Sequence, residues 1–174
     1  MVIWFTGISG TGKTTIAKQF YKFLKKKYPS TIYFDGDKFR KFFGNDIKYT
    51  LEDRDKNALR LTRLVKNLSS QKMNIVVAAN ITSFKFRIWC RKNIKNYFEI
   101  YISATKKNLM NRDYKKLYKN VILGRIKNVI GIDLPYKKPK GCHLYITNNL
   151  NKKKLINQIP KIFTKLKKRN INIY

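Results

Sequence analysis

The chain has 174 residues, a formal net charge of +31 and 43% hydrophobic residues, which suits one well-packed domain and is short for two. Its apolar runs are far shorter than the roughly 20 residues of a membrane span, and no signal peptide precedes the first of them. We therefore expect a single domain over residues 1–174, in the cytoplasm and with no membrane partner; two cysteines without metal-ligand spacing suit that reducing compartment.

The first half of the chain alternates strand-like and helix-like segments. Residues 2–6 form an apolar run typical of a buried strand, and a second strand is expected at 31–34. Between them, residues 14–27 have helical spacing, with an apolar face made of Ile16, Phe20, Phe23 and Leu24. The sequence "TLED" at 50–53 resembles a helix-capping signal, and the helix after it spaces Leu59, Leu61, Leu64, Val65 and Leu68 at helical intervals.

The alternation continues in the second half. Residues 75–79 have the continuous apolar character of a strand covered on both faces, and further strands are expected at 98–103 and 143–147. Helices are expected near 84–96, just after Thr105 and at 150–168, whereas the basic stretch 112–140 has no clear period. Repeated strand-helix alternation predicts a three-layer α/β/α fold with a mainly parallel sheet.

The glycine-rich stretch "GISGTGKTT" at 7–15 lies between the first strand and the first helix and fits the phosphate-loop pattern G-x-x-x-x-G-K-[ST]. Its backbone N–H groups can turn inward around phosphate oxygens at the positive end of the following helix. Lys13 would reach the β- and γ-phosphates, and the Thr14 hydroxyl would ligate Mg²⁺. The pattern predicts an ATP site with Mg²⁺ as cofactor, formed by Gly7, Ser9, Gly10, Thr11, Gly12, Lys13, Thr14 and Thr15.

A second polar group, "FDGDKFR" at 34–40, directly follows the second strand. Because the carboxyl ends of parallel strands border the binding crevice, these residues should face the phosphate loop. Asp35 and Asp37 are the main candidates for the carboxylate that holds Mg²⁺ together with Thr14. The same two carboxylates and Arg40 are candidates to orient an acceptor hydroxyl and to neutralise an anionic acceptor. Six of the nine acidic residues lie between residues 35 and 55, which makes this region the main source of carboxylates.

Four blocks in the same order resemble signature sequences of the adenylylsulfate (APS) kinase family, a group of phosphate-loop kinases: "VIWFTGISGTGKTTIA", "FDGDKFR", "LEDRDKNALR" and "IKNVIGIDLPYKKP". The resemblance runs from Val2 to about Pro139. It implies transfer of the γ-phosphate of ATP, with Mg²⁺, to the 3′-hydroxyl of an anionic nucleotide. It also implies a homodimer, because members of the family are commonly dimeric.

The resemblance assigns roles to residues that match the family's motifs. It implies that Asp37 and Lys13 are catalytic and that Arg40, Arg54 and Asn57 bind the acceptor. Arg54 and Asn57 are three residues apart, so on a helix they would share a face. The remaining residues expected at the acceptor are Asp35, Tyr49, Asn80, Ile81, Thr82, Lys127, Asn128 and Val129.

The basic stretch 112–140 resembles the lid of the family. Arg112, in "NRDYKKLY", matches an arginine near the ATP base at the start of the lid. Lys127 and Asn128 match the lid pair that closes over both nucleotides. A lid would exclude water, which competes with the acceptor hydroxyl for the γ-phosphate.

Three departures from the family bear on the acceptor. Val129 stands where the family places a lid phenylalanine that stacks on adenine, although the other stacking aromatic matches Tyr49. Asn80 replaces a second phenylalanine, and the family's extension before the first strand is missing. The leading expectation is adenosine 5′-phosphosulfate as acceptor, in sulfate assimilation. The alternative is another nucleotide, such as cytidine diphosphoramidate in surface-polysaccharide synthesis, since a pyrimidine needs less aromatic cover.

The high positive charge allows one non-catalytic alternative, a nucleotide-gated RNA- or DNA-binding module. The chain has 31 lysines and 9 arginines, together with 21 isoleucines, 17 asparagines and only 5 alanines. That bias is typical of an AT-rich genome, and no aromatic-rich binding motif accompanies the charge. We therefore do not expect a nucleic-acid partner, and we interpret the single histidine, His143, as structural. The charge would still steer anionic small molecules towards the surface.

Overall fold

The sheet has five strands in the order β2-β3-β1-β4-β5, and every pairing is parallel. The structure is a computed structural model that describes residues 1–44, 46–113, 116–149 and 151–174. The strands are β1 (Val2–Thr6), β2 (Thr31–Asp35), β3 (Asn74–Ala78), β4 (Tyr97–Ser103) and β5 (Leu144–Thr147). In register, Ile3 lies between Val76 and Phe98, so β1 is central and covered by its neighbours.

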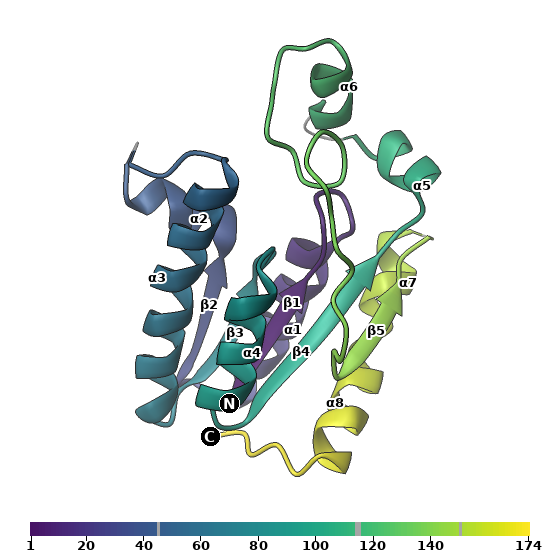
Figure 1. Cartoon of the computed structure of the whole chain (residues 1–174). Coiled ribbons are helices and arrows are strands. Elements are labelled where there is room, and N and C mark those ends of the chain that lie inside the picture. The colour runs from purple at the N-terminus through teal and green to yellow at the C-terminus, as the bar shows by residue number, and fades with distance from the viewer. Residues whose placement is uncertain (45, 114–115, 150) are drawn as a thin grey trace.

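Helices cover both faces of the sheet (Figure 1). The helices are α1 (Lys13–Lys27), α2 (Gly36–Phe42), α3 (Leu51–Ser70), α4 (Phe84–Asn93), α5 (Lys106–Asn111), α6 (Leu117–Ile122), α7 (Lys152–Ile156) and α8 (Ile159–Lys168). The residues of β1 alternate between two hydrophobic cores. Ile3 and Phe5 pack with residues of α1 and α8 such as Phe20 and Ile162, whereas Trp4 packs with residues of α3 and α4. The three-layer α/β/α fold with a parallel sheet is thus confirmed.

Several details differ from the sequence expectation. The helix expected at 150–168 is two helices, α7 and α8, with Pro160 in the first turn of α8; Leu150 lies outside the described residues. Phe23 is 56% exposed, although its ring still contacts that of Phe163. In α3 the capping signal is confirmed, since the Thr50 hydroxyl accepts the Asp53 amide at 3.1 Å, but Leu59 and Leu64 are exposed.

Two short helices fall where no helix was expected. α2 begins within the "FDGDKFR" segment and ends at Phe42, and the aperiodic stretch 112–140 contains α6. Figure 1 shows α5, α6 and the chain that follows them beyond the carboxyl ends of the strands, at the top of the view. In the described part of the chain, no helix combines the length and apolar character needed to cross a membrane.

Candidate active site

The phosphate loop joins β1 to α1 and depends on glycine. Gly10 and Gly12 have φ of 79° and 95°, in the left-handed region that side chains disfavour. A Cβ on Gly7 would lie 2.2 Å from the Ile102 carbonyl oxygen, and a Cβ on Gly12 would lie 2.7 Å from Asn148 Nδ2. The backbone can therefore approach β4 and β5 closely, leaving the loop's N–H groups at the amino end of α1, where phosphate binds favourably.

Lys13 lies across this loop. Its Nζ donates to the Ile8 carbonyl at 2.8 Å, and the buried Thr11 hydroxyl donates to the same oxygen at 2.9 Å. α1 carries no acidic residue in its first turn and ends with three lysines, so its positive amino end is not neutralised by its own sequence. The loop is thus electrostatically suited to an anion. Thr15 follows Thr14 in the first turn, and Ser9 and Gly10 lie at the partly exposed rim.

Asp35 links the phosphate loop to the end of β2. Its Oδ2 accepts hydrogen bonds from the Thr14 hydroxyl at 3.1 Å and from the Tyr33 hydroxyl at 3.2 Å. Its Oδ1 accepts from the amides of Asp37 and Lys38 and so caps α2. Burial and the nearby carboxylate raise the pKa of Tyr33, which keeps that hydroxyl a donor. Gly36 lets this corner approach β3, because a Cβ there would lie 2.7 Å from the Ala79 Cβ.

Thr14 and Asp35 together fit a magnesium ion. A hydroxyl and a carboxylate are the hard oxygen ligands that Mg²⁺ prefers, and Mg²⁺ takes most of its other ligands from water and substrate phosphates. The described residues contain no group of three or more His, Cys, Asp or Glu that would form a cage for a metal made of protein alone.

Two arginines flank Tyr49, an exposed residue between α2 and α3. The guanidinium of Arg40 lies 4.5 Å from the centre of the Tyr49 ring, and that of Arg54 lies 5.6 Å from it. Arg40 donates to the Lys48 carbonyl, and Arg54 donates to the Tyr49 carbonyl at 3.0 Å. Burial and the Arg40 charge lower the pKa of Arg54, while Asp37 opposes them. Asp37, at the exposed start of α2, is therefore within electrostatic reach of this cation pair.

Three side-chain atoms of residues predicted to bind the acceptor are buried without a hydrogen-bond partner in the described part of the chain. They are Arg40 Nε, Asn57 Oδ1 and Thr82 Oγ1. Thr82 belongs to the β3–α4 loop, residues 79–83, which also holds buried Ile81 and Asn80; the Asn80 amide oxygen accepts from the Thr6 hydroxyl at 3.2 Å. Since buried polar atoms are nearly always paired, these three atoms are suited to bind a ligand with polar groups of its own.

A turn at 128–133 contacts both Arg54 and the phosphate loop. The Asp133 carboxylate accepts the Asn128 amide at 2.5 Å and the Val129 amide at 2.6 Å. Burial raises the pKa of Asp133, but these amide bonds outweigh it and hold the pKa below its ordinary value. Arg54 reaches the Asn128 carbonyl at 2.7 Å, and Val129 is buried. A Cβ on Gly131 would lie 3.2 Å from the Ile8 side chain, so the turn also touches the phosphate loop.

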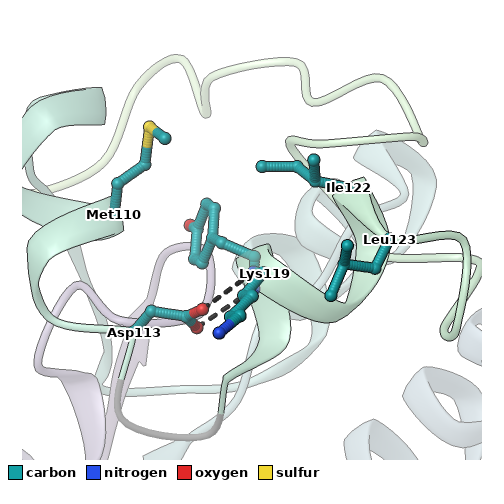
Figure 2. A pocket seen from close by; sticks show the side chains of 6 residues that line it. Met110, Asp113, Lys119, Ile122 and Leu123 are labelled. Carbon is teal, nitrogen blue, oxygen red and sulfur yellow. Dashed lines mark hydrogen bonds between the residues drawn. The ribbon is translucent and has the colours of Figure 1, made fainter.

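The start of the 112–140 segment contacts Asn148, directly after β5, and the phosphate loop. Arg112 donates to the Asn148 carbonyl at 2.8 Å, and the Tyr118 hydroxyl donates to the Ser9 carbonyl at 3.2 Å. Asp113 accepts the amides of Tyr118 and Lys119 and so fixes the first turn of α6. Figure 2 shows these bonds beside a pocket of about 220 Å³, with Met110 of α5 and Ile122 of α6 on either side of it.

The structure thus brings most of the sequence-predicted residues to one edge of the sheet. Pairwise contacts link Thr14 of the phosphate loop to Asp35, and Arg54 to Tyr49 and Asn128, while Arg112 contacts Asn148, directly after β5. Lys127 has an exposed side chain beside Asn128.

Sequence reasoning missed Asn148, which follows β5. Its Nδ2 donates to the Thr11 carbonyl at 2.9 Å, while its own carbonyl accepts from Arg112. A polar residue directly after a parallel strand was the available signal, the same one that identified Asp35.

Known proteins match both the sequence and this geometry. The sequence profile of the family described as "Adenylylsulphate kinase" matches residues 1–147. The chain is 36% identical to the cytidine diphosphoramidate kinase of Campylobacter jejuni over 165 residues, which cover 95% of each chain. It is also 36% identical to the adenylyl-sulfate kinase of Halothermothrix orenii over 145 residues, which cover 83% of this chain and 78% of that one.

Among solved structures, the fold is similar to that of the Mycobacterium tuberculosis APS kinase in complex with AMPPNP and APS. The TM-score is 0.84 at 28% identity, and the match covers 95% of this chain and 96% of that one. With a phosphate loop, an acidic residue beside it and a matching sequence profile, the chain belongs to the adenylylsulfate kinase family of phosphotransferases, whose acceptor is an alcohol group.

Proposed function

We propose that the chain transfers the γ-phosphate of ATP to the 3′-hydroxyl of cytidine diphosphoramidate. The observation that carries this choice of acceptor is Val129, a buried aliphatic residue at the position of the family's lid phenylalanine. The aromatic ring that is present, Tyr49, is already flanked by Arg40 and Arg54. Cytosine is smaller than adenine and needs less aromatic cover. The Campylobacter relative whose name gives this substrate matches along nearly the full length of both chains.

The donor half of the reaction uses the phosphate loop. Lys13 exchanges the Ile8 carbonyl for phosphate oxygens, and the loop amides bind the same phosphates. Mg²⁺ is the implied metal; the Thr14 hydroxyl and the Asp35 carboxylate would hold it, and it would neutralise charge on the phosphate oxygens. Thr14 and Asp35 already lie together before ATP binds, and Lys13 has to exchange one oxygen partner, so little reorganisation is needed.

The acceptor half uses Asp37 and the arginine pair. The acceptor 3′-oxygen forms a bond to the γ-phosphorus while the bond from that phosphorus to the departing ADP oxygen breaks. The hydroxyl proton passes to the Asp37 carboxylate, which also orients the hydroxyl. Arg40 and Arg54 bind the anionic diphosphate portion of the acceptor, and positioning supplies most of the remaining rate enhancement.

The 112–140 segment acts as the lid in this proposal. Its turn contacts Arg54 and the phosphate loop, and Tyr118 contacts Ser9, so both nucleotide sites lie under one segment. Closure would exclude water and prevent ATP hydrolysis.

APS is the second candidate acceptor. The family profile and the similarity to a structure with APS bound favour it, as does the retained Tyr49. Steady-state kinetics with MgATP and each acceptor in turn distinguishes the two. We expect kcat/KM to be at least tenfold higher for cytidine diphosphoramidate, and the reverse order would assign the chain to APS. Lys13→Ala and Asp37→Asn, assayed in parallel, identify turnover that comes from this site.

A further inference from the structure

Behind the β3–α4 loop lies a buried ion cluster made of Arg87, Arg91 and Glu99. Glu99, in β4, is fully buried, and Arg87, in α4, is 2% exposed. Arg91 donates to Glu99 Oε2 from Nε at 3.0 Å and from Nη2 at 2.5 Å, and Arg87 Nε lies 3.8 Å from Glu99 Oε1. One carboxylate therefore faces two guanidinium groups inside the protein.

Both arginines also reach beyond the cluster. Arg87 Nε donates to the Ile81 carbonyl at 2.9 Å, a buried bond to the β3–α4 loop. Arg91 Nη2 donates to the Lys140 carbonyl at 2.9 Å, at the end of the 112–140 segment. Glu99 itself is fixed in the sheet, because its amide donates to His143 Nδ1 and its carbonyl accepts the His143 amide. The cluster thus connects β4 to the β3–α4 loop and to the end of the 112–140 segment, which leads into β5.

The contacts within the cluster do not stabilise the fold enough to explain why these charges are buried. Burying charges costs free energy that their mutual attraction only partly offsets, and apolar side chains often fill such a site as well or better. Arg87 Nη2 and Glu99 Oε1 are buried without a hydrogen-bond partner in the described chain, as are the hydroxyls of Tyr97 and Tyr136, which interact electrostatically with Arg87. The bonds that are well made are those to Arg91 and to the two outer carbonyls.

We propose that Arg87 is a positioning residue for the acceptor: it fixes the Ile81 carbonyl, and with it Asn80 and Thr82, while Glu99 holds Arg87 in place. The role of the β3–α4 loop in binding the acceptor rests on the proposed function. The fixing of that loop by Arg87 does not, so the two can be tested separately. Arg91 provides the matched comparison, since it shares the helix and the carboxylate but contacts Lys140 instead.

Arg87→Lys and Arg91→Lys test this assignment. Lysine keeps the charge opposite Glu99 but has no Nε–H at the position from which Arg87 reaches both the Ile81 carbonyl and Glu99. We expect Arg87→Lys to raise the KM for the acceptor at least fivefold and to leave the KM for ATP within twofold. We expect Arg91→Lys to leave both constants within twofold. Equal effects of the two variants, or equal changes in both KM values, would overturn the proposal.

Hydrogen exchange of the proteins without substrates gives a readout that needs no turnover. Backbone amides at 80–83 should exchange faster in Arg87→Lys than in wild type and at the wild-type rate in Arg91→Lys. Unchanged exchange in Arg87→Lys would refute the positioning role even if the proposed acceptor is correct. Glu99→Gln, which weakens the anchor and keeps both arginines, should produce the Arg87→Lys pattern. Failure of both Arg87→Lys and Glu99→Gln to fold would assign the cluster to folding and overturn the proposal.

Discussion

The Thr14 hydroxyl donates a hydrogen bond to the Asp35 carboxylate over 3.1 Å, although the two residues are 21 apart in the chain. The other oxygen of the same carboxylate caps α2, the helix that carries Asp37 and Arg40. One side chain therefore links the phosphate loop to α2, the helix that carries the residues proposed to bind the acceptor.

Replacing Asp35 should weaken magnesium binding. Asp35→Asn keeps an oxygen for the cap of α2 but removes the anionic ligand. We expect the Mg²⁺ concentration for half-maximal activity to rise roughly tenfold or more, measured by Mg²⁺ titration at saturating ATP. The control is Asp46→Asn, which breaks a surface pair with Arg60 and should change little. An unchanged Mg²⁺ requirement in Asp35→Asn would remove Asp35 from the metal site.

Lys13 should contribute mainly to the transition state. It is the cation in the loop that can follow charge as it develops on the transferred phosphoryl group. We expect Lys13→Ala to lower kcat by about 10²- to 10³-fold. Lys18→Ala, on the exposed face of the same helix, should retain wild-type activity. Comparable losses in the two variants would point to a general effect of charge rather than to phosphate binding.

Val129 should determine the preferred acceptor base. Val129→Phe restores the aromatic group of the family, and stacking on a base is worth about 1–3 kcal/mol. We expect the ratio of kcat/KM for APS to that for cytidine diphosphoramidate to rise by roughly 5- to 100-fold. Val129→Leu adds apolar volume without a ring and should leave the ratio within about twofold. The same ratio in the phenylalanine variant and in wild type would place base selection elsewhere, with Asn80 the next residue to replace.

His143 should make stability depend on pH. The ring stacks on Phe98, and its Nδ1 accepts the Glu99 amide, so the neutral form is required. Burial, with the charges of Arg169 and Arg91, lowers the pKa of His143 from 6.5 to about 4. Between these values the unfolded chain binds a proton that the folded chain does not, so stability is present above pH 6.5 and is lost as pH falls towards 4.

Because the ring is only half-buried and solvent screens it in part, we expect this loss to be on the order of 2 kcal/mol. Urea unfolding at several pH values measures it. His143→Asn offers an oxygen to the Glu99 amide but does not titrate, so its stability should fall less steeply over the same window. Parallel curves for the two proteins would mean that other groups cause the acid sensitivity.

The parts of the fold that follow from local physics were predictable. The buried strands have continuous apolar runs, and the phosphate loop needs glycine at positions with positive φ such as Gly10 and Gly12. Helical spacing, by contrast, predicts which residues share a face of a helix but not how much of that face is buried. Leu59 and Leu64 therefore satisfy the period of α3 and are still exposed. The break between α7 and α8 lies next to Pro160, because proline fits the first turn of a helix but disrupts a helix interior.

The candidate site was predictable where its residues lie at the ends of strands or in known motifs. The rest depends on contacts between segments far apart in the chain. α2 begins because Asp35 caps it, and that carboxylate is itself held by Thr14 and Tyr33. The Glu99 cluster joins α4, β4 and the end of the 112–140 segment, and no local period indicates such a set. Charge alone was also a poor guide, because lysines are spread along the whole sequence.

The position of the new phosphate in the product tests whether the chain is a nucleotide 3′-kinase. The purified chain is incubated with MgATP and the better of the two acceptors, and the product is analysed by phosphorus–proton correlation NMR alongside ADP release. We predict one ADP for each product molecule, with the new phosphate on the ribose 3′-oxygen, and a rate at least 100-fold lower for Asp37→Asn with unchanged ATP binding. ADP release without a phosphorylated nucleotide, or phosphate on any other oxygen, would contradict the assignment of this chain as a nucleotide 3′-kinase.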